Sequence, residues 1–237
     1  MFWGDYYLSA SFPPATLDPL TSRDIDFYER ETTRIHEYIA NLRNVCTKMG
    51  LQMGDPFFPT MDDATFETAM ISISTQTDNP IVIDFLDCVS GLKHHEVEKN
   101  ADQIEVEGRK FWVLNPCYCL KARVYNLVTL YPRLGKSEER IAIEAQRVAL
   151  GIEIVRKHLS DFIAKGEMRN AHKRSMAIIK LAKTPIGRTL YRKYGLDVLS
   201  AIPDAGLDQR FYQYVRPDAV RYLHKGDPRN PPPSPTL

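Results

Sequence analysis

The stretch Thr21-Ser22-Arg23-Asp24-Ile25-Asp26-Phe27 contains the pattern on which the predicted fold and function of this chain depend. Polar and apolar residues alternate from Asp24 onward, which is typical of a β-strand. Residues two apart in a strand point to the same side, so Asp24 and Asp26 would present two carboxylates together. Ile25 and Phe27 would face a core. Like charges so placed repel one another unless a cation lies between them, and their hard oxygen atoms suit Mg²⁺, which also binds phosphate.

A third carboxylate interrupts a second apolar run. Asp84 lies within Ile81-Val82-Ile83-Asp84-Phe85-Leu86, a β-branched stretch that predicts a strand. An acid on such a strand is costly to bury unless it is paired or binds a metal. If the two strands are neighbours, Asp84 completes an acidic triad that can hold two metal ions. Asp87 is the competing third acid.

Each acidic feature also has an ordinary structural interpretation. An Asp-x-Asp pair in a turn can serve only as a cap for backbone N–H groups. Asp84 can be a hydrogen-bonded acid at a sheet edge. The combination of the two features is more specific than either one.

The rest of the chain divides at Asn115-Pro116, where an N-cap residue precedes a proline suited to the first helical position. Before it we expect a helix over 29–49, strands over 70–74 and 81–86, and a hairpin over 104–113. After it we expect helices from 116, over 137–166, and near 168–183, 186–200 and 208–223. The prediction is an α+β protein, with a small mixed sheet and its helices followed by a helical C-terminal region. Its parts would be 1–115, 116–226 and a disordered proline-rich tail, 227–237.

Composition narrows the function classes. The chain has 237 residues, of which 43% are hydrophobic and 26% charged, so it is neither collagen-like nor wholly disordered. No apolar run approaches the roughly 18 residues of a membrane span. The N-terminus does not resemble a secretory signal, and the four cysteines match no common zinc template, so we expect a cytoplasmic protein with reduced thiols. Walker, Gly-x-Ser-x-Gly and Gly-x-Gly-x-x-Gly motifs do not occur.

Three blocks in this order resemble a known superfamily. They are 20–27 (LTSRDIDF), 83–86 (IDFL), and 113–116 (VLNP) leading into Leu120-Lys121-Ala122-Arg123 and Asn126-Leu127. Together they resemble the polymerase-beta-like nucleotidyltransferases, most closely the abortive-infection (AbiE-type) toxin-like branch. The resemblance covers roughly residues 3–160.

The resemblance implies a set of roles. Asp24 and Asp26 would bind two Mg²⁺ ions that carry a nucleoside triphosphate, and Asp84 would bind the metal that activates the attacking hydroxyl. Ser22 and Arg123 would contact the nucleotide, Arg123 through the triphosphate. Arg123 can equally be a surface residue of its helix, and Lys121 is the less favoured alternative. The acceptor hydroxyl would belong to RNA, protein or a small molecule.

One element of the family pattern is missing. The family places a Gly-Gly or Gly-Ser turn before Asp-x-Asp, and the residues 1–7 resemble the helix that follows that turn. No glycine pair precedes them. We therefore expect a misplaced start, a truncated gene or a copy that has lost catalysis.

The charge distribution suggests a second function. Residues 165–193 hold nine lysines and arginines and a single acid, Glu167, so this region carries a formal charge of +8 in a chain of net charge +1. Such a region can bind nucleic acid or can be a solvated helix face. The alternative hypothesis is therefore an inactive nucleotidyltransferase-fold protein that binds nucleic acid or a partner within a defence or toxin–antitoxin pair. Tyrosines interleaved with these charges can stack on bases or belong to the core.

Overall fold

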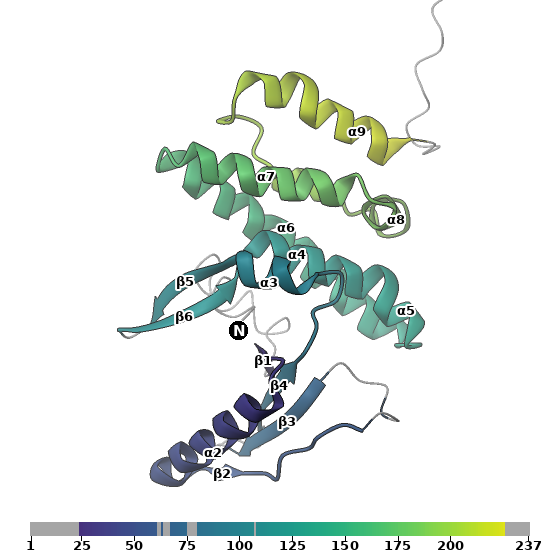
Figure 1. The fold of residues 1–237 in the computed structure, drawn as a ribbon. Helices are drawn as coiled ribbons and strands as arrows, with labels where there is room; N and C mark the ends of the chain where they lie inside the picture. The colour runs from purple at the N-terminus through teal and green to yellow at the C-terminus, as the bar shows by residue number, and fades with distance from the viewer. Residues whose placement is uncertain (1–23, 61–62, 64–66, 75–79, 107, 226–237) are drawn as a thin grey trace, which may run out of the picture. The chain divides into compact units, whose positions relative to one another are not determined.

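The computed structural model describes residues 24–60, 63, 67–74, 80–106 and 108–225 (Figure 1). The chain forms two compact units, which divide between Asn115 and Pro116. The fold is α+β: a small mixed sheet lies in the first unit, and the second is helical. Ser22 and the tail from 227 onward lie outside the described residues, as do the residues that precede Asp24.

The first unit contains both strands and helices. Its elements are β1 Asp24–Tyr28, α2 Thr32–Met49, β2 Gln52–Met53, β3 Glu67–Ser74, β4 Ile81–Leu86, α3 His94–Lys99, β5 Ala101–Val106 and β6 Arg109–Leu114. Four strands form a sheet in the order β1-β4-β3-β2, in which β1 and β4 are parallel and the other pairs antiparallel. Strands β5 and β6 form a separate antiparallel hairpin.

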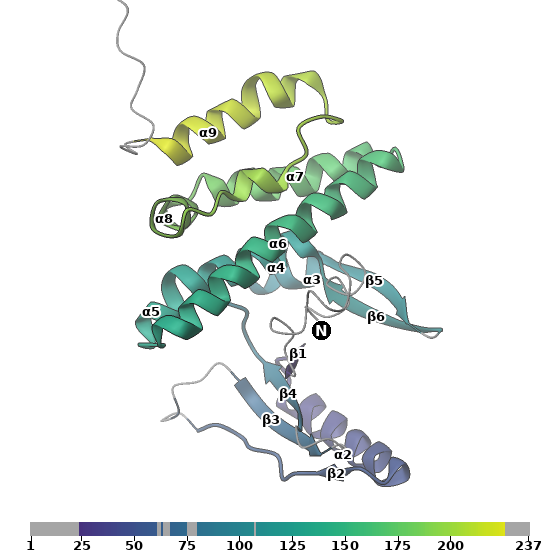
Figure 2. The same ribbon diagram turned by 180° about the vertical axis from the view of Figure 1, so that it is seen from behind.

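Helix α2 covers one face of the four-stranded sheet (Figures 1 and 2). Its buried side chains Ile35, Ile39 and Cys46 recur at helical spacing and pack against the apolar face of the sheet. The helix ends at Gly50, whose φ of 66° is a conformation that glycine adopts without strain. The expected helix over 29–49 ends where it was predicted to end, but it begins three residues later, at Thr32.

All the secondary-structure elements described in the second unit are helical. Its elements are α4 Pro116–Tyr125, a π-helical turn η3 Asn126–Leu130, α5 Tyr131–Arg133, α6 Glu138–Ala164, α7 Met168–Ala182, α8 Pro185–Tyr194, the 3₁₀ turn η4 Val198–Ala201, a second π-helical turn η5 Phe211–Val215, and α9 Arg216–His224. The expected helix over 186–200 is broken, because Gly195 adopts a φ of 70° and ends α8. Ser137 caps α6 as predicted, and its hydroxyl accepts a hydrogen bond from the Arg140 N–H at 3.3 Å.

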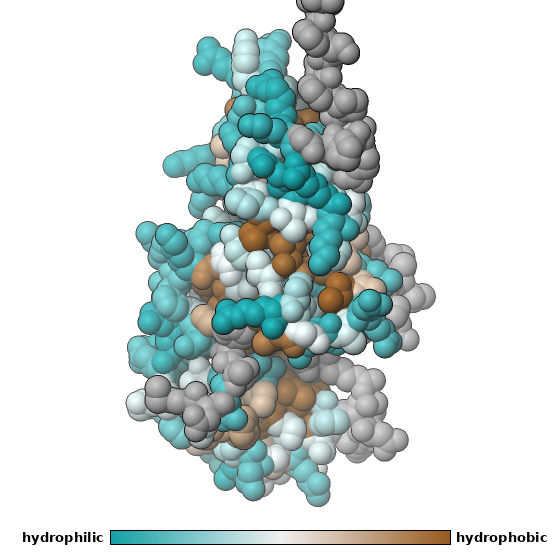
Figure 3. Space-filling model, turned by 90° about the vertical axis from the view of Figure 1, so that its right-hand side faces the viewer, coloured by the Kyte–Doolittle hydropathy of each residue, from teal (hydrophilic) through white to brown (hydrophobic). Residues whose placement is uncertain are grey.

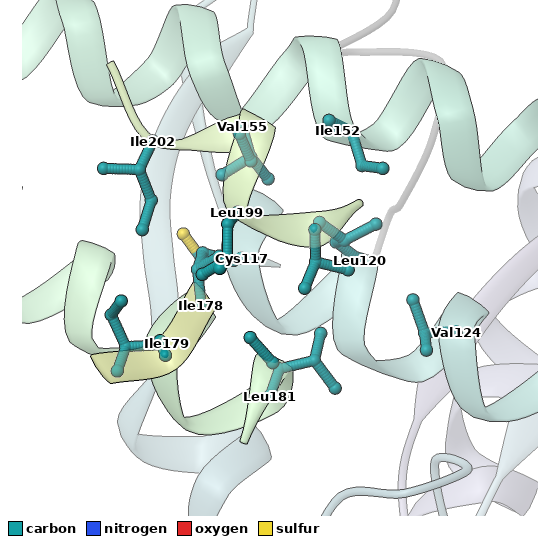
Figure 4. Packing of buried hydrophobic residues seen from close by; sticks show 14 of the residues in the cluster. Cys117, Leu120, Val124, Ile152, Val155, Ile178, Ile179, Leu181, Leu199 and Ile202 are labelled. Carbon is teal, nitrogen blue, oxygen red and sulfur yellow. The ribbon is translucent and has the colours of Figure 1, made fainter. Parts of the chain in front are cut away.

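The core of this unit is formed where α4, α6, α7 and η4 meet. Leu120, Val155, Ile178 and Leu199 are among the buried side chains that point toward one another there (Figure 4). Hydrophilic residues predominate on the face of the molecule in Figure 3, where hydrophobic residues form smaller groups. Within the part of the chain that the structure describes, no helix is long and apolar enough to cross a membrane.

Candidate functional site: an acidic face on two parallel strands

The site begins with the register between β1 and β4. These strands run side by side and in parallel, and Asp26 of β1 is the register partner of Asp84 of β4 (Figures 1 and 2). Register partners in a sheet lie on the same face, and neighbouring strands are about 4.8 Å apart. The two carboxylates predicted from separate segments therefore lie next to each other on one face.

The opposite face of the same strands is apolar. Ile25 and Phe27 pack with the buried Ile83 and Phe85 in the cluster that α2 covers. The Phe27 and Phe85 rings are stacked, with centroids 5.8 Å apart. Side chains alternate along a strand, so Asp26 and Asp84, which lie between these apolar residues, point to the other side of the sheet.

The surroundings of Asp84 are partly shielded from water. Asp26 and Asp84 are both half-buried, and the Oδ1 atom of Asp84 is excluded from solvent. Both residues form interactions within the protein. Asp87, the competing acid, follows the end of β4 and is exposed, so the register favours Asp84 over it as the neighbour of Asp26.

The backbone of Asp24 belongs to β1, opposite Val82, but its side chain lies outside the described part of the structure. Among the described side chains, no group of three or more His, Cys, Asp and Glu residues is placed to hold a metal ion. The oxygen donors of Asp26 and Asp84 fit a hard cation such as Mg²⁺. Two protein carboxylates are a common set for Mg²⁺, which usually keeps waters and takes phosphate oxygens as further ligands.

A tyrosine–histidine pair adjoins this face. Tyr28 continues the alternation of Asp26 toward the carboxyl end of β1, and its hydroxyl lies 2.5 Å from Nδ1 of His94, the first residue of α3. The two rings are tilted by 34° with centroids 6.2 Å apart. Burial raises the pKa of the Tyr28 phenol, so the group is neutral at physiological pH. Sequence reasoning missed this pair, although the alternation that predicted β1 extends to Tyr28.

Arg123 lies in the second unit and is held by an acid that the sequence reasoning did not single out. Its Nη1 donates to both carboxylate oxygens of Glu144, at 3.0 and 3.2 Å. Glu144 is only 1% exposed, and Arg147 Nη1 lies 3.8 Å from its Oε2 atom. Burial lowers the pKa of Arg147, and the charge of Arg123 lowers it further. The three residues form a partly buried ion cluster between α4 and α6.

The basic region 165–193 spans α7 and α8, and its charges have different environments. Lys183 pairs with Asp218 at 2.5 Å, Arg188 stacks on the Tyr222 ring at 4.1 Å, and Arg192 donates to the Lys225 carbonyl. These cations help to hold α8, and the end of α7 that precedes it, against α9.

The exposed cations of α7 differ from those of α8. Arg169, Lys173 and Lys180 are exposed, and none of them pairs with an acid that the structure describes. Positions 169, 173 and 180 lie within about 40° of one another around a helix of 3.6 residues per turn, so they form one stripe.

Most of the tyrosine side chains interleaved with the basic region contact other residues of the second unit. Tyr191 stacks on His224 with centroids 4.5 Å apart, and the Tyr212 hydroxyl donates to the Pro203 carbonyl. Phe211 is fully buried. Tyr214, at 68% exposure, is the most exposed aromatic residue among those described in this unit. The interpretation of these aromatics as core residues therefore describes most of them better than base stacking does.

Comparison with known proteins identifies no relative. No protein-family model, no curated protein and no solved structure matches the chain.

Proposed function

We propose that the protein is a Mg²⁺-dependent nucleotidyltransferase that moves a nucleoside monophosphate from a nucleoside triphosphate to a hydroxyl acceptor. The observation that carries this proposal is the register of Asp26 with Asp84 on two parallel strands. Open sheets with parallel strands bind ligands at the carboxyl ends of those strands. The acidic face extends toward that end of β1 and β4. The order of the three sequence blocks, which resembles the nucleotidyltransferase superfamily, supports the same assignment.

The proposed reaction needs little covalent chemistry from the protein. The acceptor oxygen bonds to the α-phosphorus, the bond from that phosphorus to the pyrophosphate oxygen breaks, and the hydroxyl proton is released. Bound Mg²⁺ supplies Lewis acidity to the phosphate oxygens and neutralises the charge that develops on them. Asp26 and Asp84 hold and orient the cation–phosphate group, and the apolar packing behind them keeps the two carboxylates at a fixed separation.

The test is transfer of label from α-labelled nucleoside triphosphates to RNA, protein and small-molecule hydroxyls in the presence of Mg²⁺. We expect Asp26→Asn and Asp84→Asn to lower transfer by at least about 100-fold, a usual size for loss of a residue that binds the reacting group. Asp87→Asn is the matched control, because this neighbouring acid is exposed, and it should retain activity. Equal activity of the three variants, or no transfer by the unaltered chain to any acceptor, would refute the proposal.

The proposed reaction requires a compartment that contains free nucleoside triphosphates and Mg²⁺. We therefore propose a cytoplasmic protein, which the four free thiols at Cys46, Cys88, Cys117 and Cys119 also favour.

The stripe on α7 favours a second candidate function, the binding of a nucleic-acid strand. The span from Arg169 to Lys180 is about 16 Å along the helix axis at 1.5 Å per residue, which is comparable to a few successive phosphates of a strand. This surface would serve an active enzyme that modifies RNA, or a catalytically inactive binding protein of a defence or toxin–antitoxin system.

Its test is the salt dependence of binding to a fluorescent RNA and to the matching DNA. The triple variant R169Q/K173Q/K180Q should lower the slope of log K against log salt by about 2 to 3, since each lost phosphate contact contributes about 0.7 to 0.9. K48Q/K99Q/K110Q removes the same charge from exposed lysines of the first unit and is the matched control. Equal loss in both triple variants would show that net charge, and not this stripe, determines binding.

A further inference from the structure

The carboxyl end of the acidic face carries an aromatic ring whose position is fixed from a second element. Tyr28 follows Asp26 by two residues on the same side of β1, so their Cα atoms are about 6.6 to 6.8 Å apart along the strand. Its ring is half-buried, whereas the His94 side chain that contacts it is exposed. The hydrogen bond between the Tyr28 hydroxyl and His94 therefore holds an aromatic ring at the border of the acidic face.

We infer that Tyr28, positioned by His94, is the contact for the nucleoside part of the triphosphate, beside the carboxylates that hold its phosphates. This inference rests on the proposed function. Two adjacent positions offer complementary chemistry: carboxylate oxygens suit the cation–phosphate group, and the face of a phenol ring suits a nucleobase or its sugar. The separation of Asp26 and Tyr28 along β1 is about the length of the sugar that joins a phosphate to a base.

His94 is a positioning residue in this arrangement. A tyrosine side chain whose hydroxyl is tied to a neighbouring element loses rotational freedom before the ligand arrives, so less entropy is lost on binding. Base–aromatic stacking tolerates every base, since each base has a π face. The contact should therefore raise affinity for all nucleoside triphosphates without selecting strongly among them.

The experiment measures binding, by calorimetry with Mg²⁺, of a non-hydrolysable α,β-methylene ATP and of tripolyphosphate, which has no nucleoside. In Tyr28→Leu we expect affinity for the ATP analogue to fall about 5-fold to about 150-fold, the range of base stacking, while tripolyphosphate binds as before. Tyr28→Phe keeps the ring but loses the hydrogen bond to His94, so it should weaken binding of the ATP analogue less than Tyr28→Leu does and about as much as His94→Ala does. His94→Ala changes an exposed residue. It should weaken binding of the ATP analogue and leave binding of tripolyphosphate unchanged. Tyr38→Leu is the matched control, because Tyr38 belongs to α2 and stacks on Phe85 on the opposite face of the sheet.

The outcomes separate the two proposals. If the unaltered chain binds neither probe, the proposed function itself is refuted. If it binds both and Tyr28→Leu weakens both equally or neither, the pair serves only to attach α3 to β1 and the inference is wrong, while the proposed function stands. If Tyr28→Leu does not fold, the His94→Ala and Tyr28→Phe variants decide. Unchanged nucleotide affinity in His94→Ala would overturn the positioning role.

Discussion

Removing the charge of Glu144 should destabilise the second unit more than most single substitutions would. In Glu144→Gln the side chain keeps its size, but Arg123 and Arg147 lose the carboxylate that lies between them. Arg123 and Arg147 are only 17% and 12% exposed, so water compensates their charges poorly. The Nε atom of Arg147 is already buried without a described hydrogen-bond partner. Breaking a buried ion pair on one side costs about 3 to 5 kcal/mol, and we expect a loss in this range.

Equilibrium urea unfolding followed by circular dichroism measures this loss. The control is Lys157→Gln, which removes the lysine of an exposed pair with Asp161 on the same helix, and should cost about 0.5 kcal/mol or less. The double variant Glu144→Gln/Arg123→Met should be more stable than the sum of its single variants predicts, by about 0.5 to 3 kcal/mol. If Glu144→Gln unfolds within about 0.5 kcal/mol of the unaltered chain, the cluster does not stabilise this unit and our reasoning fails.

Three further predictions concern the second unit. Burial lowers the pKa of His158 to about 4, so the unfolded chain binds more protons below about pH 6.5, and stability should fall by about 2 kcal/mol between pH 7.5 and pH 5. His158→Leu should flatten that dependence in urea unfolding, and an unchanged slope would contradict it. In Gly187→Ala the new Cβ would lie 2.4 Å from the Leu181 carbonyl oxygen, which should cost more than about 1 kcal/mol, whereas Gly151→Ala meets only a side-chain methyl at 3.3 Å and should be nearly neutral in thermal melts. Thr184→Ala removes the hydroxyl that accepts from the Gly187 N–H at 3.0 Å, and should lower stability by about 1 kcal/mol; no shift in the urea midpoint would show that this cap is dispensable.

Local patterns were sufficient to predict most of the elements. The alternation at Asp24–Phe27, the β-branched run of β4 and the Ser137 cap each gave the element that the structure contains. These signals are short-range, because the alternation of a strand or the cap of a helix can be recognised within a few residues of sequence. Helix α3 was missed, since its six residues are mostly polar and exposed and only Val97 is buried.

Contacts between distant residues were harder to predict. That β1 and β4 would be neighbours was a conditional prediction, because pairing between strands is not encoded in either strand alone. The role of Glu144 could have been found: it falls on the apolar stripe of α6 between Ile141 and Val148, where a lone acid requires a buried partner. Its partner Arg123 lies 21 residues earlier, and nothing in the local pattern connects the two.

The apolar face of the sheet is the reason that the two acids meet. A slip of β1 by one residue against β4 would turn Ile25 and Phe27 away from α2 and expose them, and would bring the aspartates toward the core. The contacts of the partly buried Ile25 and Phe27 with the buried Ile83 and Phe85 involve four apolar side chains, and full burial of one such side chain contributes about 1.5 to 3 kcal/mol, whereas two carboxylates at this separation repel each other by about 4 kcal/mol at most. The hydrophobic contacts therefore impose a juxtaposition that the carboxylates alone would avoid. Weakening those contacts, as in Phe27→Ala, should lower affinity for Mg²⁺ even though no carboxylate is altered, because the register that aligns Asp26 with Asp84 is then less strongly determined.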